Sequence, residues 1–491
     1  MTSNSNFFGD RHFKNRTLGE LWILLQLSWP VITTLILEYL PSITTTILVG
    51  RYLGIELMEG ATLASMYMNV FGISIGFGLS GGLDTLCSQA NGAGDKQQVG
   101  RWFQRYFLIL LLLLVPVSIL NWFSKTILVY ILRQPPIISD YAQRYCRSAI
   151  IVIPALWFYE LLKKLFITQG AVLQMILPAI ITNITNIGFS LFVLRCTNYG
   201  LEGLAFARSL ASLSSPCVLL IYSKYTKSFE LVWPSDGWSK EIFFSWKTAL
   251  SFGLPCLFQM CLEWWAFELQ AALSGLLPNN NITLGAHQIL FNVTGFTYMW
   301  YSGIGTAISV YLANLLGAGR AKQAYKSAMI GLVLAGFVGL LFCALLFSLM
   351  KILPSFFVRD AQIIIETEKV FPVLASYQLV DSLECAFAAI FRGCGYQILC
   401  ASYSFIAFYV IGLPLSVLLG FVVRLGLLGV WLGPAVALLL HSFASFFTLK
   451  LFNFEKLSEE AIERVTAESL QNCISNSIQE DGRPLLVNLD E

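Results

Sequence analysis

The sequence is short of charged residues. Only 12% of its 491 residues are Asp, Glu, Lys or Arg, whereas a soluble chain of this length carries roughly a quarter, because its surface must be solvated. Hydrophobic residues make up 56% of the chain, and the mean hydropathy is +0.69. A soluble core could not contain that many apolar side chains, so most must face lipid. The sequence therefore predicts an integral membrane protein.

Histidine and paired cysteine are also scarce. The three histidines, His12, His287 and His441, lie far apart, and none of the eleven cysteines forms a Cys-x-x-Cys pair. The sequence thus predicts no metal centre, no disulfide framework and no cofactor, and it treats the cysteines as small apolar residues. A net charge of +2 gives no large field that would attract nucleic acid, so no nucleic-acid partner is expected.

Long apolar runs are abundant. Runs near the length that one span requires, about 20 residues, occur twelve times, and they lack the alternation of a barrel strand. An all-α polytopic fold with twelve transmembrane helices follows, because a helix satisfies its own backbone inside lipid. The spans are expected to start near Leu21, Ala61, Tyr106, Ser148, Leu177, Leu204, Lys247, Ala286, Ser327, Thr367, Cys400 and Leu425.

The polar segments divide the chain into five parts. Residues 1–20 are expected to be a cytoplasmic N-terminal segment, 21–222 the first six spans, 223–246 a cytoplasmic linker, 247–449 the second six spans, and 450–491 an acidic cytoplasmic tail, disordered or loosely helical.

Charge decides the predicted orientation. An even number of spans puts both termini on one side, and the excess of Lys and Arg in the segments on that side makes it the cytoplasm. The Asn281-Ile-Thr acceptor then lies in an outer loop, as glycosylation requires. No signal peptide is expected before the first span. The plasma membrane is the expected location, and an organelle membrane remains an alternative.

The two halves repeat each other at a fixed spacing of 225 residues. Pro30 and Glu38 recur as Pro255 and Glu263. Other pairs in the same register, with one residue inserted before the last two, are Phe71 and Phe296, Gly78 and Gly303, Gly92-Ala93-Gly94 and Gly317-Ala318-Gly319, Gln98 and Gln323, Phe166 and Phe391, Gly170 and Gly395, Gly200 and Gly426, and Gly203 and Gly429. Because each unit has six spans, the repeats are parallel and related by an axis along the membrane normal. Two such lobes enclose a cleft that rocking exposes to each side in turn.

Carboxylates inside the predicted spans indicate function, because a buried charge is costly unless it is solvated or paired. Glu263 lies in the outer half of the seventh span, and Glu268 follows five residues later on another face. Asp381 and Glu384 share a face of the tenth span. Glu38, the first-half copy of Glu263, stands more alone. A carboxylate that holds either a proton or a cation couples the movements of the two, which is what antiport requires.

Other charged residues and the prolines have structural explanations. Glu160 and Lys164 are one turn apart and are expected to pair, and Asp84 is expected to cap or pair near the cytoplasmic end of its span. Pro30 and Pro255 are expected to kink their helices.

Aromatic residues accompany the acids. Trp264 and Trp265 follow Glu263, and Tyr298 and Trp300 lie in the next span. Aromatic faces hold organic cations through their quadrupole, although Trp and Tyr also pack helices together or sit at the membrane interface.

Several of these motifs resemble the multidrug and toxin extrusion (MATE) family, specifically its eukaryotic branch. They are Cys261-Leu-Glu-Trp-Trp-Ala-Phe-Glu268, Leu83-Asp-Thr-Leu-Cys-Ser-Gln89, the Gly-Ala-Gly turns and Phe391-Arg-Gly-Cys-Gly395. The similarity extends from about Leu18 to Phe454.

The resemblance implies a V-shaped, two-lobed antiporter that exchanges protons for organic cations. It implies that Glu263, Glu268 and Asp381 bind cations and couple protons, and that Trp264 and Tyr298 line the cavity. The chain departs from its vertebrate relatives at three points. Asn292 replaces an acidic residue of the eighth span, Glu384 and Glu38 are acidic where the relatives are not, and the tail contains no thirteenth span. The expected partners are small organic cations, protons and the bilayer, with a monomer as the functional unit.

Three other functions would require different residues. A flippase for lipid-linked or amphipathic substrates, on the related two-lobed fold, would need Arg and Lys in the cleft to hold an anionic substrate. A membrane enzyme would need a convergent His/Asp or metal set. A channel would need rings of equivalent residues from symmetric subunits. The carboxylates and the two unequal halves favour the antiporter.

Overall fold

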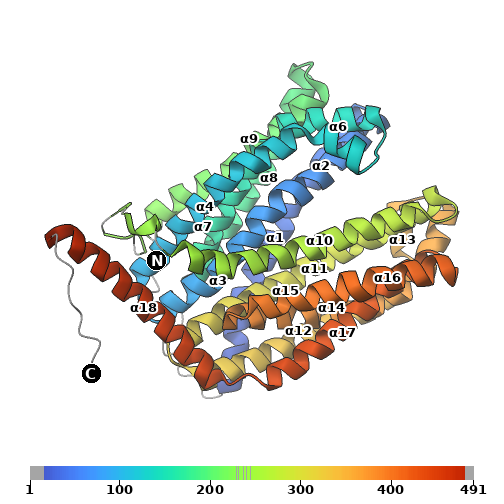
Figure 1. The fold of residues 1–491 in the computed structure, drawn as a ribbon. Coiled ribbons are helices and arrows are strands. Elements are labelled where there is room, and N and C mark those ends of the chain that lie inside the picture. Colours follow the sequence, from blue (N-terminus) through green and yellow to red (C-terminus); the bar gives the residue numbers. More distant parts are fainter. Residues whose placement is uncertain are drawn as a thin grey trace.

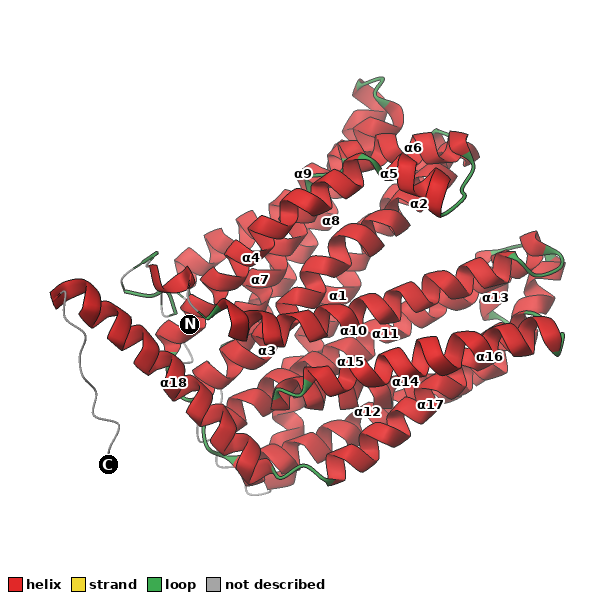
Figure 2. Cartoon of the chain, viewed as in Figure 1, coloured by secondary structure: helices red, strands yellow, loops and turns green. Residues whose placement is uncertain are grey.

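The computed structural model describes residues 16–481 except for Ser228, Leu231, Asp236, Ser239 and Phe244. The described elements are all helical (Figure 2). In the first half they are α1 (Arg16–Tyr52), α2 (Ile55–Met68), η1 (Asn69–Ile73), α3 (Ser74–Gly92), α4 (Lys96–Trp122), α5 (Ser124–Thr126), η2 (Ile127–Ile131), α6 (Pro136–Ser148), α7 (Val152–Thr168), η3 (Val172–Met175), α8 (Ile176–Cys196) and α9 (Gly200–Thr226). In the second half they are η4 (Lys240–Phe243), α10 (Trp246–Gly275), α11 (Asn280–Gly317), α12 (Ala321–Leu349), α13 (Leu353–Phe357), α14 (Ala361–Cys394), α15 (Gln397–Phe405), η5 (Ile406–Gly412), α16 (Leu413–Val417), η6 (Leu418–Val422), α17 (Leu427–Lys450) and α18 (Phe454–Asp481).

Consecutive elements join into twelve membrane-crossing rods, six in each half. They are α1, α2–α3, α4, α6–α7, η3–α8, α9, α10, α11, α12, α14, α15–η6 and α17. Within the described residues, nine of these rods are long and apolar enough to cross a membrane on length and composition alone. The remaining rods are α6–α7, in which α7 has only 17 residues, α10 and α11. Buried Lys163 and Lys164 lie on α7, and half-buried Glu263 and Glu268 lie on α10.

The turns that separate the rods follow from local sequence. Each Gly-Ala-Gly turn places its last glycine in the left-handed region, Gly94 at φ +86° and Gly319 at φ +75°, where a side chain would be strained. Asp95 then caps α4, since its Oδ1 accepts a hydrogen bond from the backbone N–H of Gln98 at 3.0 Å. The glycine turn therefore precedes a new helix at the same place in both repeats, whereas the side-chain cap occurs only at Asp95, since the equivalent Arg320 makes no cap bond to α12.

The two six-rod groups form a V (Figure 1). We call α1–α9 the N-lobe and α10–α17 the C-lobe. The lobes meet at the end of the molecule where α3 and α18 lie, the narrow end, and diverge toward α6 and α13, the wide end. At the lobe boundary α3 packs against α10 and α11, and α1 packs against α11.

The contacts between the lobes are reciprocal, as a two-fold repeat requires. A Cβ atom on Gly92 would overlap the carbonyl of Asn314, and one on Gly317 would overlap the carbonyl of Gln89. Gln89 and Asn314 are themselves one repeat apart. Gly78 and Gly303 behave the same way, each facing the backbone of the equivalent residue in the other lobe, Leu257 and Ile32. The structure confirms the parallel repeat predicted from the sequence, and it shows that the repeated glycines permit close backbone approach.

The tail differs from the expectation of a disordered or loosely helical segment. Residues 454–481 form α18, which crosses the narrow end. Phe454, Leu457 and Ala461 are buried in a cluster made mostly of C-lobe residues, and Val465 is buried in a cluster made mostly of N-lobe residues. These residues follow a three-to-four spacing that puts them on one face of a helix. The acidic composition concealed this apolar stripe.

Polar contacts also fasten α18 to both lobes. The Oγ atom of Ser458 donates a hydrogen bond to the carbonyl of Leu316 in the C-lobe at 2.8 Å. On the N-lobe side, the Nη1 atom of Arg105 lies 2.9 Å from Oε1 of Glu468, and the exposed fractions of the two side chains are 0% and 7%. The helix thus bridges the lobes where they meet.

The predicted segments 1–20 and 223–246 lie partly outside the described residues. Of the first, only Arg16 onward is described, and it already belongs to α1. Of the second, the described residues comprise the end of α9, the short helix η4 and the turns around them.

Candidate functional site

The first carboxylate of the site belongs to α10. Glu263 is half-buried, and its Oε1 atom accepts hydrogen bonds from Nε2 of Gln259 and from Oγ of Ser404, both at 3.1 Å. Gln259 is one turn earlier on the same helix, whereas Ser404 comes from α15. Both donors are neutral, so their hydrogen bonds fix the orientation of the Glu263 carboxylate without supplying a positive charge.

Two further carboxylates face the same region from α14. Asp381 and Glu384 are each 5% exposed, and the Oδ2 atom of Asp381 has no hydrogen-bond partner among the described residues. Oε1 of Glu384 lies 3.2 Å from Nδ1 of His441 on α17, at ion-pair distance but without hydrogen-bond geometry. Within the described part of the chain, neither acid has a Lys or Arg at ion-pair distance. Carboxylates this deep, unpaired by a base, are expensive in a membrane and indicate a functional site.

Glu268 stands apart from these three. It is half-buried on another face of α10, as its spacing from Glu263 predicts. Among the residues described, it too has no ion-pair partner. Asn292 is half-buried on α11, one rod away from the carboxylates of α10.

The aromatic residues divide into two groups. Trp264 and Tyr298 are half-buried beside the acids, and Trp265 is 39% exposed, with its ring 6.1 Å from that of Phe71 on the N-lobe element η1. Trp300 instead packs edge-on against Phe342 of α12, with ring centroids 5.6 Å apart. Trp264, Trp265 and Tyr298 are therefore better placed than Trp300 to receive a cation.

The N-lobe acids are bound to lysines. Nζ of Lys163 on α7 lies 2.8 Å from Oε2 of Glu38 and 2.7 Å from Oε2 of Glu160. Nζ of Lys164 lies 2.8 Å from Oδ2 of Asp84 and 3.6 Å from Oε1 of Glu160. The predicted pairing of Glu160 with Lys164 is present, and Asp84 is paired as expected.

Glu38 corrects the sequence analysis in one respect. The sequence leaves it alone in its lobe, but the fold brings Lys163 to it from 125 residues away. The ammonium of Lys163, at 2.8 Å, gives this carboxylate a charged hydrogen-bond partner. Glu38 is thus the copy of Glu263 in position and differs from it in electrostatic environment.

The Asp84 network also joins the two lobes. Nε of Arg392, from the C-lobe helix α14, lies 3.7 Å from Oδ2 of Asp84. Close by, Oγ1 of Thr85 donates to the carbonyl of Arg392 at 2.5 Å, and Nδ2 of Asn91 donates to Oδ1 of Asn314 at 2.7 Å. These polar contacts hold the narrow end together.

One group of side chains has the donor types of a metal site. Glu384, Cys400 and His441 are buried, and their ligand atoms lie within 4.8 Å of one another. A structural zinc ion takes four such ligands in tetrahedral geometry, and the described residues contribute no fourth His, Cys or carboxylate to this group. The three residues therefore fall short of a structural zinc site.

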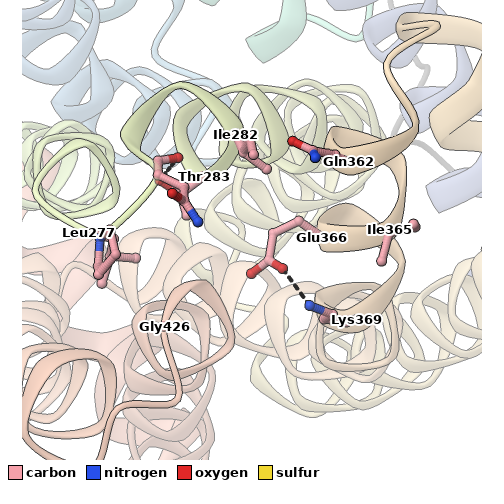
Figure 3. Close-up of a pocket in the computed structure, with 10 residues that line it drawn as sticks. Leu277, Ile282, Thr283, Gln362, Ile365, Glu366, Lys369 and Gly426 are labelled. Carbon is pink, nitrogen blue, oxygen red and sulfur yellow. Dashed lines mark hydrogen bonds and ion pairs between the residues drawn. The ribbon is translucent and has the colours of Figure 1, made fainter.

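A separate pocket of about 350 Å³ lies at the wide end of the C-lobe (Figure 3). It is lined by the loop after α10, the start of α14 and Gly426, and the ion pair between Glu366 and Lys369, at 2.8 Å, closes one side. None of the five predicted acids lines it.

A family model, MatE, matches residues 30–192 and 255–418, and the two matched segments start one repeat apart. The chain belongs to the MatE family. It is therefore a membrane transporter of the MATE type and not an enzyme, as the sequence predicted.

Relatives of this MATE protein agree along most of its length. Multidrug and toxin extrusion protein 1 of Oryctolagus cuniculus is 32% identical over 93% of this chain and 79% of its own. The protein of the same name from Homo sapiens is 32% identical over 90% and 76%. The crystal structure of the eukaryotic MATE transporter AtDTX14 superimposes with a TM-score of 0.87 at 25% identity, covering 92% of this chain and all of that one.

The sequence analysis missed His441 as a neighbour of the acids, and it missed Lys163 as a partner of Glu38. His441 lies in the apolar run of the last span. The rule that flagged the carboxylates, an ionisable residue inside a span, would have flagged it too.

Proposed function

We propose that this MATE protein is a secondary active transporter that exports small organic cations in exchange for protons by alternating access. The observation that carries the proposal is the set of C-lobe carboxylates, Glu263, Asp381 and Glu384, which lie inside the membrane without a Lys or Arg partner among the described residues. Such a group can be neutralised either by a proton or by a cation, and a site that accepts only one at a time couples their opposite movements.

The named relatives support the class of substrate. They are called multidrug and toxin extrusion proteins, and the half-buried aromatics Trp264 and Tyr298 beside the acids offer the faces that organic cations prefer. Glu268, on another face of α10, is assigned to the same cavity, with Asn292 as a neutral lining residue. Glu384 and Glu38 are assigned to proton coupling, Glu384 by direct exchange and Glu38 through its lysine.

The lobe contacts support alternating access. The lobes touch at the narrow end through reciprocal glycine contacts and diverge at the wide end. With both termini in the cytoplasm, as the Lys and Arg distribution predicts, the narrow end is cytoplasmic and this conformation faces outward. A single copy contains both lobes, so the proposed unit is a monomer, expected in the plasma membrane.

The alternative of a flippase for lipid-linked or amphipathic substrates has less support. An anionic substrate needs free basic side chains, but Lys163 and Lys164 are each within ion-pair distance of two carboxylates, and Arg392 is near Asp84.

The function is tested with the purified chain in vesicles that are acidic inside. Tetraethylammonium should enter as protons leave, and collapsing the pH gradient should stop uptake. Glu263→Gln and Asp381→Asn keep shape but remove the exchangeable charge, so both should abolish uptake while the protein still reaches the membrane. Uptake driven by sodium alone, or wild-type uptake in both variants, would contradict the proposal.

The orientation is tested separately with single cysteines in a cysteine-free background. A cysteine at Asn281 should react with an impermeant thiol reagent in intact cells, and one at Gly237 only after permeabilisation. The reverse pattern would invert the proposed topology and make the narrow end extracellular.

A further inference from the structure

A line of buried and half-buried polar side chains runs inside the C-lobe from the carboxylates toward the narrow end. On α17 it consists of His441, Ser445 and Thr448, which share one helix face at spacings of four and three residues. His441 is 3% exposed and Ser445 is 0% exposed. His441 lies nine residues before Lys450, the last residue of α17, so it is roughly 13 Å from that end at 1.5 Å per residue.

The opposite wall of this line comes from α15. The ring of Tyr403 lies 5.8 Å from the ring of His441, and its hydroxyl is 2.7 Å from Oγ1 of Thr448. Tyr403 therefore spans the distance between the histidine and the threonine nearest the narrow end. One residue further along α15, Ser404 bonds to Glu263.

Several polar atoms along the line have no hydrogen-bond partner among the described residues. They are Oε1 of Glu384, Nδ1 and Nε2 of His441, and Oγ of Ser445. Burying a polar atom without a partner costs about 1–3 kcal/mol, and an ionisable residue inside a span adds to that cost. At the repeat-equivalent positions of α9, Ser215 and Leu219 take the places of His441 and Ser445, so the fold alone does not require these two residues.

We infer that His441, with Ser445 and the Tyr403–Thr448 pair, forms the narrow-end branch of the proton route, linking Glu384 to the cytoplasmic face. The inference rests on the proposed proton exchange and adds a path to it. His441 acts through Glu384 and touches no substrate, so it is a positioning and relay residue.

The proton count balances at each step. The imidazole accepts a proton from the Glu384 carboxyl at Nδ1 and releases the one on Nε2, and an exchange of tautomers restores the ring. Each hydroxyl further along accepts one proton and releases its own. In this conformation Glu384 and His441 lack hydrogen-bond geometry and Ser445 has no described partner, so the route is interrupted. An antiporter requires that interruption while its carboxylates face the other side, because a continuous route would leak protons.

The titratable and charged groups near His441 come from every neighbouring helix. They are Glu384, Asp381 and Arg392 on α14, Cys400 and Tyr403 on α15, and Glu263 on α10. Substitution of His441 by glutamine leaves all of these in place and removes only the group that can take up and release a proton.

The test separates proton movement from cation movement in the same vesicles. His441→Gln should lower tetraethylammonium uptake driven by a pH gradient by about tenfold or more, the size expected when a proton-transfer group is removed. Exchange of labelled for unlabelled tetraethylammonium at equal pH needs no proton release, so it should stay within about twofold of wild type. Ser445→Ala should lower the gradient-driven rate in the same selective way.

His287→Gln is the matched control. His287 is also buried in the C-lobe, 1% exposed on α11, but its ring packs against Trp431 at 5.6 Å, away from the acids. Both fluxes should remain within about twofold of wild type in this variant.

Three results would overturn the relay. The first is unchanged gradient-driven uptake in His441→Gln. The second is an equal fall of gradient-driven uptake and of exchange at equal pH in that variant, which would indicate a structural role for His441. A metal chelator could reproduce the variant's defect in wild type, which would make Glu384, Cys400 and His441 metal ligands. If the wild type itself does not respond to the pH gradient, the proposed function fails first, and that outcome is distinct from these three.

Discussion

The reciprocal glycines allow one quantitative prediction about the conformational cycle. Gly317 ends α11 in helical conformation, so alanine fits its own backbone without strain. The added Cβ would overlap the carbonyl of Gln89 on α3. Because the obstacle is backbone and not the end of a flexible side chain, Gly317→Ala should force the lobes apart at the narrow end.

The cost can be worked from the contact. The Cβ would sit about 1 Å or more inside van der Waals distance, and overpacking of this kind costs about 1–3 kcal/mol. The same displacement stretches the hydrogen bond between Asn91 and Asn314, now 2.7 Å, whose net contribution is about 0.5–1.5 kcal/mol. A total of about 2–4 kcal/mol lowers the population of this conformation relative to others by about thirtyfold or more.

Spin labels provide the measurement. Gln97 and Lys322 are exposed, stand at equivalent positions after the two Gly-Ala-Gly turns, and can carry the labels. In the wild type most molecules should show a short distance between the two labels, because the lobes are in contact at the narrow end. Gly317→Ala should shift most of this distribution to longer distances and slow transport.

A matched substitution provides the control. Gly188→Ala on α8 adds a methyl group that meets nothing within 4 Å, so it should leave both the distances and transport unchanged. Gly317→Ala could instead keep the short distance between the two labels and the wild-type transport rate. The close approach of the Gly317 and Gln89 backbones would then not determine this conformation, and the reasoning would be wrong.

Two further predictions concern charge. Glu468→Gln weakens the buried pair with Arg105 and should lower the midpoint of thermal unfolding, since breaking such a pair costs about 3–5 kcal/mol when one charge is left buried. Glu460→Gln removes one partner of the more exposed pair between Lys456 and Glu460, so it should change the midpoint of thermal unfolding little. Equal midpoints in the two variants would show that the pair on α18 does not fasten the lobes. Lys163→Met removes the ammonium that Glu38 and Glu160 share. Two carboxylates then lose this charged partner, so the variant should yield less folded protein. Normal expression of Lys163→Met would mean that the N-lobe network is dispensable.

The helices and their duplication could be predicted from sequence because those signals are local. The length of an apolar run decides whether a helix can span, and the register of Pro30 with Pro255 shows the repeat without any coordinates. The carboxylates of the C-lobe were found for the same reason, since an acid in an apolar run is visible in one dimension.

The electrostatic state of each acid could not be predicted. Glu38 and Glu263 occupy equivalent places, yet Lys163 reaches Glu38 from a helix 125 residues away, whereas Glu263 receives only neutral donors. Which base meets which acid depends on how helices rotate and pack, and that is a property of contacts between distant segments.

For the tail and the last span, too, packing between distant segments decided what the sequence did not predict. The acidic composition after Lys450 predicted disorder, but Val465 and Phe454 find apolar surfaces on two different lobes that exist only after the rods have assembled. His441 is one polar residue in an apolar run until packing brings it to 3.2 Å from Glu384. Sequence alone determined that this chain is a duplicated twelve-helix membrane protein with acids in its second half, because hydrophobic length and repetition are properties of the chain itself. Tertiary structure alone decided which of those acids meet a lysine and which do not, because an ion pair requires a base within a few ångströms in space.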